Sequence, residues 1–187
     1  MTTARRLFFA LWPGPAALVV ATAAVHRLVP PGTGRPQRSD QLHLTLEFLG
    51  DVPEPRLGSV LEAGAAVAGS AAPFELVLDR LEHWRRPQVL CLTASVVPQP
   101  LQALVGLLRL ALSDRGFVPE RRPFRAHLTL ARKVRLPPAA ESVEPLRWAA
   151  HDYSLVESIT GPEGTRYVRL ATWPRAPGRS GSHMRIT

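Results

Sequence analysis

The tetrapeptide His-Leu-Thr-Leu occurs twice in the sequence, as His43-Leu44-Thr45-Leu46 and as His127-Leu128-Thr129-Leu130. Successive side chains of a β-strand point to opposite faces of the sheet. Each copy therefore predicts a strand that buries its leucines on one face and presents its histidine and threonine on the other. The same alternation places Glu47 on the face of His43, and Phe48 on the face of the leucines. Two such strands facing one cleft would supply the two sides of a single site.

Two histidines and two threonines, with no carboxylates or thiols in the tetrapeptides, favour acid–base chemistry at phosphorus. One imidazole can take a proton from the attacking oxygen while the other protonates the leaving oxygen, because histidine titrates at about pH 6.5. Threonine hydroxyls can donate hydrogen bonds to the non-bridging oxygens. A zinc site is less favoured, because two histidines supply only half of a tetrahedral shell and Cys91 is the only cysteine. The structural alternative is a pair of unrelated core histidines.

The composition indicates a globular protein with an excess of positive charge. Of the 187 residues, 45% are hydrophobic and 20% are charged, which favours a single domain over residues 1–174. Twenty-three basic residues against 15 acidic ones give a net charge of +8, which suits a polyanionic partner such as nucleic acid. Lys133 is the only lysine. Genomic base composition can also account for so many arginines, so the net charge alone identifies no partner.

The N-terminal region combines Arg5-Arg6 with an apolar stretch and then small residues, as a secretory signal does. Pro13-Gly14-Pro15 interrupts that stretch, which predicts a buried strand over residues 7–11 and a separate helix over residues 16–29. No uninterrupted apolar run reaches the roughly 18 residues of a membrane-spanning helix. We therefore expect a cytoplasmic protein without a membrane segment.

The spacing of apolar residues predicts two further helices, around residues 57–67 and 101–112, the latter opened by Pro100 and closed near Gly116. Together with the first strand and helix, the expected order is β-α-β-α-β-β-α-β-β-β. The tail at residues 175–187 lacks periodicity and is predicted to be disordered, and its Gly181–Met184 stretch has the sequence of a cloning remnant. Strand-like runs occupy residues 7–11, 42–49, 74–81, 89–97, 125–131, 153–159 and 166–173.

Five stretches around these motifs resemble the RNA 2′,3′-cyclic phosphodiesterase family, also called 2′-5′ RNA ligases or LigT-like proteins, of the two-histidine phosphoesterase superfamily. The resemblance covers nearly the whole chain up to Pro174. The chain departs from it at Ala126, where many members carry proline, a difference that bears on loop stiffness more than on chemistry. The stretches are Arg6–Pro13, His43–Gly50, Pro123–Arg132, Leu155–Ser158 and Tyr167–Pro174.

The resemblance implies an α+β, bilobal fold with pseudo-twofold symmetry, in which two antiparallel sheets line a central cleft and the helices lie outside. It also implies hydrolysis of a terminal RNA 2′,3′-cyclic phosphate to a 2′-phosphomonoester, without a metal or another cofactor. Carried over to this sequence, His43 is the general acid that protonates the 3′ oxygen and His127 is the general base that activates water. The same site could run the reverse reaction, 2′-5′ ligation of RNA.

Binding residues are expected on the same strand faces. Thr45 and Thr129 are candidates for the phosphate oxygens, and Arg125, which shares the face of His127, is a candidate for the substrate phosphate. The expected partner is RNA with a cyclic phosphate end, or a small cyclic nucleotide, bound by a monomer. A non-catalytic RNA-binding module is the competing interpretation. Basic residues that could extend the contact along RNA are Arg121, Arg122, Arg132, Lys133 and Arg135. Candidates for stacking on a base, with core packing as the alternative, are Phe9, Phe48, Trp84 and Tyr153.

Overall fold

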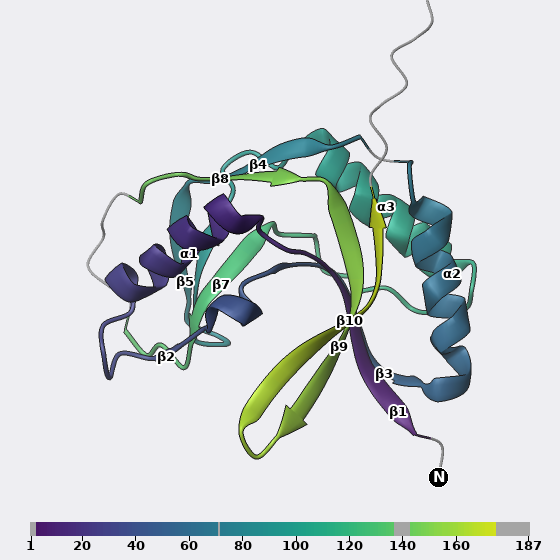
Figure 1. Ribbon diagram of the computed structural model, residues 1–187, viewed down its shortest axis with the longest axis horizontal. Coiled ribbons are helices and arrows are strands. Elements are labelled where there is room, and N and C mark those ends of the chain that lie inside the picture. Colours follow the sequence, from purple (N-terminus) through teal and green to yellow (C-terminus); the bar gives the residue numbers. More distant parts are fainter. Residues whose placement is uncertain (1–2, 71, 137–142, 175–187) are drawn as a thin grey trace, which may run out of the picture.

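The computed structural model describes residues 3–70, 72–136 and 143–174 (Figure 1). The predicted tail at 175–187 lies outside these ranges. The described helices are α1 (Pro15–Leu28), α2 (Leu57–Val67) and α3 (Gln99–Ser113), with short 3₁₀ helices η1 (Ser39–Gln41) and η2 (Glu54–Arg56). The strands are β1 (Ala4–Leu11), β2 (Arg35–Pro36), β3 (Leu44–Pro53), β4 (Phe74–Leu78), β5 (Arg80–Trp84), β6 (Val89–Thr93), β7 (His127–Arg132), β8 (Leu146–Ala150), β9 (Asp152–Gly161) and β10 (Gly164–Pro174).

Two four-stranded antiparallel sheets carry one copy of the motif each. Sheet A has the strand order β10-β9-β1-β3, and sheet B has the order β2-β7-β6-β5. The two motif strands, β3 and β7, contact each other between the sheets, while β4 and β8 form a separate two-stranded ribbon (Figure 1). This architecture confirms the α+β fold with antiparallel sheets.

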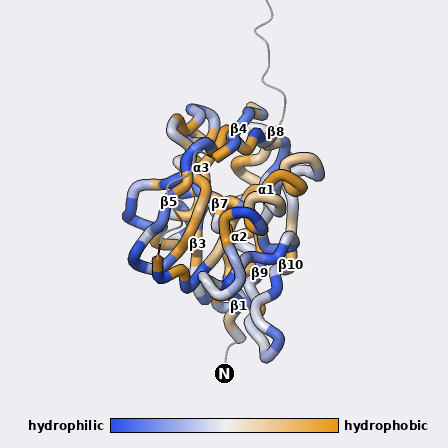
Figure 2. The backbone as a smooth tube through the Cα atoms, turned by 90° about the vertical axis from the view of Figure 1, so that its left-hand side faces the viewer, coloured by the Kyte–Doolittle hydropathy of each residue, from blue (hydrophilic) through white to orange (hydrophobic). Residues whose placement is uncertain are grey.

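The helices cover the apolar faces of the two sheets. α1 contacts β7 and β8, whereas α2 and α3 pack together and contact β10 and β3 respectively. Figure 2 shows hydrophobic stretches along α1 and β3. One cluster of buried apolar side chains joins both sheets to the three helices, and Leu44 and Leu128 of the two motifs belong to it. Cys91 is buried as well, and burial raises the pKa of its thiol to about 12.

The helix boundaries follow the sequence signals. α1 begins at Pro15 and α3 carries Pro100 in its first turn, where a missing backbone N–H costs no hydrogen bond. After α3 the chain reverses at Gly116, which has a φ of 71°, and the N–H of Phe117 donates to the carbonyl of Leu112 over 3.0 Å. No helix among the described residues is long and apolar enough to cross a membrane.

Three details of the strand prediction are wrong. The run predicted at 74–81 is two strands in different sheets, because the Asp79 carboxylate accepts hydrogen bonds from the N–H and the hydroxyl of Ser95 at the break. β2 is only two residues long, too short for a periodic pattern. β8 was also missed. Its buried residues Leu146, Trp148 and Ala150 alternate with Arg147 and Ala149, a short pattern without β-branched residues.

Each motif strand contains a β-bulge at the fourth residue of its motif. The pairing of β3 with β1 skips Leu46, and the pairing of β7 with β6 skips Leu130. An unpaired extra residue shifts the alternation of side chains from that point onward. The internal repeat is therefore a repeat of backbone geometry as well as of sequence.

The bulge at Leu46 reverses the faces of the next two residues. Glu47 lies opposite the core residue Phe9 and is 2% exposed, whereas Phe48 lies opposite Phe8 and is 45% exposed. The prediction that Glu47 shares the face of His43, and Phe48 that of the leucines, is wrong because simple alternation ends at the bulge.

Candidate active site

His43 directly precedes β3, and His127 is the first residue of β7. The first histidine lines a cavity of about 440 Å³, and the second lines a neighbouring cavity of about 730 Å³. Thr45, Phe48 and Arg132 line both cavities, so the two are lobes of one cleft between the motif strands. The predicted pair of histidines is thus brought to a common site.

One backbone hydrogen bond orients each imidazole ring. Nδ1 of His43 lies 2.7 Å from the carbonyl oxygen of Gln41, and Nδ1 of His127 lies 2.7 Å from the carbonyl oxygen of Arg125. A carbonyl oxygen can only accept, so Nδ1 carries the proton in both rings. Nε2 is left to act as an acceptor in the neutral ring or as a donor in the charged ring.

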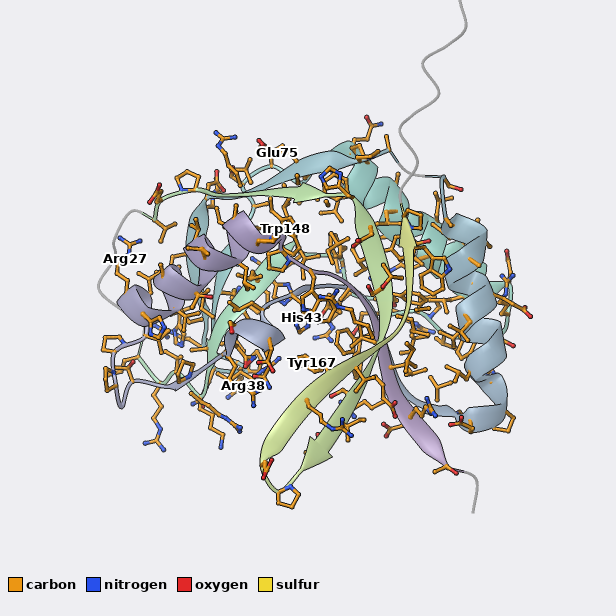
Figure 3. The ribbon with its side chains drawn as sticks, viewed as in Figure 1. Arg27, Arg38, His43, Glu75, Trp148 and Tyr167 are labelled. Atoms are coloured by element: carbon orange, nitrogen blue, oxygen red, sulfur yellow. The ribbon has the colours of Figure 1, made fainter. Side chains whose placement is uncertain are left out.

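Three aromatic rings surround His43. The ring of Trp12 stacks on it with centroids 5.2 Å apart, Phe8 lies at 5.1 Å, and Tyr167 approaches edge-on at 5.0 Å. Figure 3 shows His43 near the middle of the molecule, with Tyr167 close by. Burial lowers the pKa of His43 to about 4, and the positive charge of Arg132 acts in the same direction. The free protein therefore holds His43 neutral at pH 7.

His127 packs against one ring, that of Trp84, with centroids 4.7 Å apart. The Glu82 carboxylate accepts a hydrogen bond from Nε1 of Trp84 over 2.7 Å and another from Arg125 over 2.6 Å. The guanidinium of Arg125 also lies over Trp84, 4.8 Å from the ring centroid. Burial lowers the pKa of His127, and the charges of Arg125 and Arg132 lower it further.

The threonines of both motifs line the cleft, as the alternation before each bulge predicts. Thr129 borders the lobe of His127, and Thr45 borders both lobes. Arg132 joins them at the boundary between the lobes. Alternation alone assigns Arg132 to the face opposite His127, five positions away, but the bulge at Leu130 returns it to the cleft. From the sequence, Arg132 was expected only to extend the basic surface along RNA.

Arg125 lines the lobe of His127, as predicted, but its charge is already engaged. It forms an ion pair with Glu82 and lies on the ring of Trp84. Arg132, by contrast, has no ion pair with any acidic residue in the described part of the chain. The geometry therefore makes Arg132 the better placed cation for an anionic group between the two histidines.

The four aromatic candidates divide evenly. Phe9 and Tyr153 are 0% and 1% exposed and belong to the core. Phe48 and Trp84 line the cleft instead. Sequence reasoning gave no special role to Trp12, which follows β1 directly and stacks on His43.

Glu47 connects the first motif strand to the segment that leads into the second. Its buried carboxylate forms an ion pair with Nε of Arg109 on α3 over 2.7 Å. The same carboxylate accepts a hydrogen bond from the N–H of Glu120 over 2.6 Å. Among the residues that the structure describes, no three His, Cys, Asp or Glu side chains are grouped so that they could hold a metal ion.

The family model for LigT-like phosphoesterases matches residues 12–91. An RNA 2′,3′-cyclic phosphodiesterase of Escherichia coli (strain K12) is 33% identical over 182 residues, which cover 92% of this chain and 98% of that protein. One of Thermus thermophilus is 32% identical over 185 residues, which cover 88% of this chain and 87% of that protein.

Solved structures agree with the sequence matches. The crystal structure of E. coli LigT in its apo form superposes with a TM-score of 0.81 at 29% identity. The match covers 93% of this chain and 99% of that one. With identity above 30% to relatives spanned almost end to end, and with the same fold, the chain belongs to the LigT-like family of RNA 2′,3′-cyclic phosphodiesterases.

Proposed function

We propose that this protein hydrolyses the 2′,3′-cyclic phosphate at the 3′ end of RNA to a 2′-phosphomonoester, without a metal ion. The main support for the proposal is the geometry of the cleft between the motif strands. Each motif places a histidine, whose Nε2 is not used in the backbone hydrogen bond, and a threonine at this cleft. The names of the E. coli and T. thermophilus relatives, which are called RNA 2′,3′-cyclic phosphodiesterases, support the substrate.

In the proposed reaction His127 acts as the general base and His43 as the general acid. Nε2 of His127 takes a proton from water, and the water oxygen forms a bond to phosphorus on the side opposite the 3′ oxygen. The bond between phosphorus and the 3′ oxygen breaks, and Nε2 of His43 gives its proton to that oxygen. One water is consumed, and the 2′-phosphate remains on the RNA.

The threonine hydroxyls and Arg132 would bind the phosphate oxygens that are not part of the ring. Negative charge concentrates on these oxygens as water attacks, so fixed donors and a nearby cation lower the barrier. Thr129 borders the lobe of His127, and Thr45 and Arg132 border both lobes. The three groups would therefore hold the phosphate midway between acid and base.

The low pKa of His43 bears directly on its proposed role. A general acid must carry a proton, yet burial keeps this ring neutral at pH 7 in the free protein. A bound cyclic phosphate carries a negative charge, and a nearby opposite charge raises the pKa of an imidazole. Binding of the substrate would thus promote protonation of His43. The protonated ring would then donate its proton to the 3′ oxygen as the bond from that oxygen to phosphorus breaks.

We further propose that residues 1–174 act as one catalytic domain, that the protein functions as a monomer and that it works in the cytoplasm. A single chain supplies both histidines and both threonines, so the site needs no second copy. One core cluster spans both sheets, which supports a single domain. Small cyclic nucleotides would fit the same chemistry as RNA ends.

The test is incubation of an oligoribonucleotide ending in a 2′,3′-cyclic phosphate with the protein in excess EDTA. We expect ring opening to a 2′-phosphate, identified by phosphorus NMR, and no turnover by the double variant His43→Ala/His127→Ala. A 3′-phosphate product would contradict the proposed bond cleavage. Activity that needs an added divalent ion would contradict the metal-free mechanism, and RNA binding without turnover would favour a non-catalytic module.

A further inference from the structure

A second large cavity, of about 910 Å³, lies outside the cleft, between the C-terminal end of α1 and the segment that follows β7. Its apolar lining includes Leu90 and Val134. Figure 3 labels Arg27 at this edge of the molecule, well away from His43. The four basic residues that line the cavity are Arg27, Arg35, Lys133 and Arg135.

Among the described residues, no acidic side chain balances the charge of this cavity. No acidic residue of the described ranges lines it. None of its four cations takes part in an ion pair within the described ranges, whereas eight arginines elsewhere do. All four are exposed. Unpaired cations gathered around one hollow attract an anion more strongly than cations spread over a surface.

The wall of the cavity is held in place by specific contacts. The N–H of Val134 donates to the carbonyl of Gln88 over 3.0 Å, and the carbonyl of Val134 accepts from Nε2 of His83 over 2.8 Å. Gly34 packs so closely on Val134 that a Cβ at this position would lie 2.7 Å from a methyl group. The backbone and the side chain of Val134 are thus both held in place, and with them the segment that carries Lys133 and Arg135.

A line of cations connects this cavity to the cleft. Arg132 borders both lobes of the cleft, and the next residue, Lys133, has a φ of 58° and borders the outer cavity. Arg35 of β2 lies directly opposite Arg132 in the sheet and lines the outer cavity too. Its guanidinium also lies beside Gly164, next to Thr165 of the His43 lobe.

We infer that this outer cavity binds the phosphodiester backbone of single-stranded RNA on the 5′ side of the cyclic end. The inference rests on the proposed function, which places the 3′-terminal nucleotide in the cleft, so that the strand can continue only in the 5′ direction. The successive negative charges of an RNA backbone are complementary to the unpaired cations that run from the cleft to the outer cavity. No aromatic ring of the described residues lines the cavity, so the contact reads the backbone rather than the bases. The natural substrate is accordingly an oligonucleotide.

The test compares an oligoribonucleotide with a mononucleotide, both ending in the same 2′,3′-cyclic phosphate. In the double variant Lys133→Gln/Arg135→Gln we expect KM for the oligonucleotide to rise about 3- to 30-fold, as two exposed charge pairs allow. The slope of log kcat/KM against log salt should flatten by about 0.7 for each phosphate that the variant no longer neutralises. Kinetics with the mononucleotide should not change. Arg27→Gln should shift the oligonucleotide values in the same direction by less.

The control is Arg147→Gln on β8, an exposed arginine whose ion-pair partner Glu75 lies at another edge of the molecule from Arg27 (Figure 3). An equal effect of the control variant, or oligonucleotide kinetics unchanged in the double variant, would overturn the inference. Failure of the wild-type protein to hydrolyse the oligonucleotide would instead refute the proposed function. In that case, fluorescence anisotropy with the oligonucleotide in EDTA tests RNA binding at the outer cavity independently of hydrolysis. Weaker binding by the double variant than by the control would support the inference, and equal binding would refute it.

Discussion

The two halves of the cleft share a backbone design. In each half, Nδ1 of the histidine lies 2.7 Å from the carbonyl two residues earlier, and a bulge occupies the fourth motif position. A tryptophan packs on each histidine, and an arginine lies over each tryptophan. The arginine–tryptophan–histidine stacks are Arg169–Trp12–His43 and Arg125–Trp84–His127.

The halves differ in what else surrounds the imidazole. His43 has Phe8 and Tyr167 against it besides its tryptophan, and burial lowers its pKa to about 4. The tryptophan beside His127 is instead fixed by a carboxylate, that of Glu82. The repeated backbone therefore sets the direction in which Nε2 points, whereas the surrounding side chains set how strongly each ring holds a proton.

The largest expected effect comes from removing either imidazole. We predict that His43→Ala and His127→Ala each lower kcat/KM by about 10²- to 10⁴-fold on a cyclic-phosphate substrate, because each ring performs a separate proton transfer. Steady-state kinetics measures this, with circular dichroism as the control for folding. Near-full activity in either variant would show that one half of the cleft is not catalytic.

The threonines should come next. Thr45→Val and Thr129→Val keep the shape of the side chain but remove the hydroxyl donor, so we expect kcat to fall by about 10- to 10³-fold in each variant. The bell-shaped dependence of kcat/KM on pH should persist, since both histidines are intact. If both valine variants keep the wild-type kcat, the two lobes do not share the phosphate as proposed.

The two arginines of the second half allow a sharper comparison. Arg132 is unpaired within the described residues and borders both lobes, whereas Arg125 is engaged by Glu82. We expect Arg132→Gln to raise KM by about 10- to 100-fold, as loss of a charged hydrogen bond does. Arg125→Gln should raise KM by less. The reverse order, measured with a mononucleotide substrate, would restore the assignment made from the sequence.

The smallest effect concerns proton affinity. By NMR titration we expect His43 to titrate at about pH 4, and Trp12→Leu to raise the pKa of His43 by relieving its burial. Trp84→Leu should raise the pKa of His127 and leave that of His43 unchanged. A titration of His43 at about 6.5 in the wild-type protein would remove the asymmetry between the halves.

The same shift has a consequence for stability. His43 binds a proton more weakly in the folded protein than in the unfolded chain, so the unfolded state takes up more protons between pH 6.5 and about 4. The free energy of unfolding should therefore fall as the pH drops through this window, and the contribution is intact above it. His43→Gln should flatten this slope relative to the wild-type protein.

The sequence predicted the parts of the molecule that obey simple periodicity. The three helices, both motif strands and the common cleft face of each histidine and threonine follow from apolar spacing and from alternation. Past the bulges that alternation fails. Glu47 and Phe48 lie beyond the bulge at Leu46, and both were assigned to the wrong face. Arg132 lies beyond the bulge at Leu130, and its place in the cleft was not predicted.

Contacts between residues far apart in the chain could not be predicted from the sequence pattern either. Nothing in the pattern indicates that Glu82 engages Arg125, 43 residues away. Nor does it indicate that Tyr167 of the C-terminal strand reaches His43. The order of acid and base rests on family resemblance alone, because the backbone around the two histidines is nearly the same.

The most direct test of unequal roles is hydrolysis of a cyclic substrate in which sulfur replaces the bridging 3′ oxygen. A thiol has a pKa of about 8.5, so a thiolate leaves without a general acid. If His43 is the acid and His127 the base, His43→Ala, which is impaired on the oxygen substrate, should return to within about tenfold of wild-type kcat/KM on the sulfur substrate, whereas His127→Ala should stay impaired on both. Recovery of His127→Ala, or of neither variant, would contradict the assignment of acid and base to the two halves.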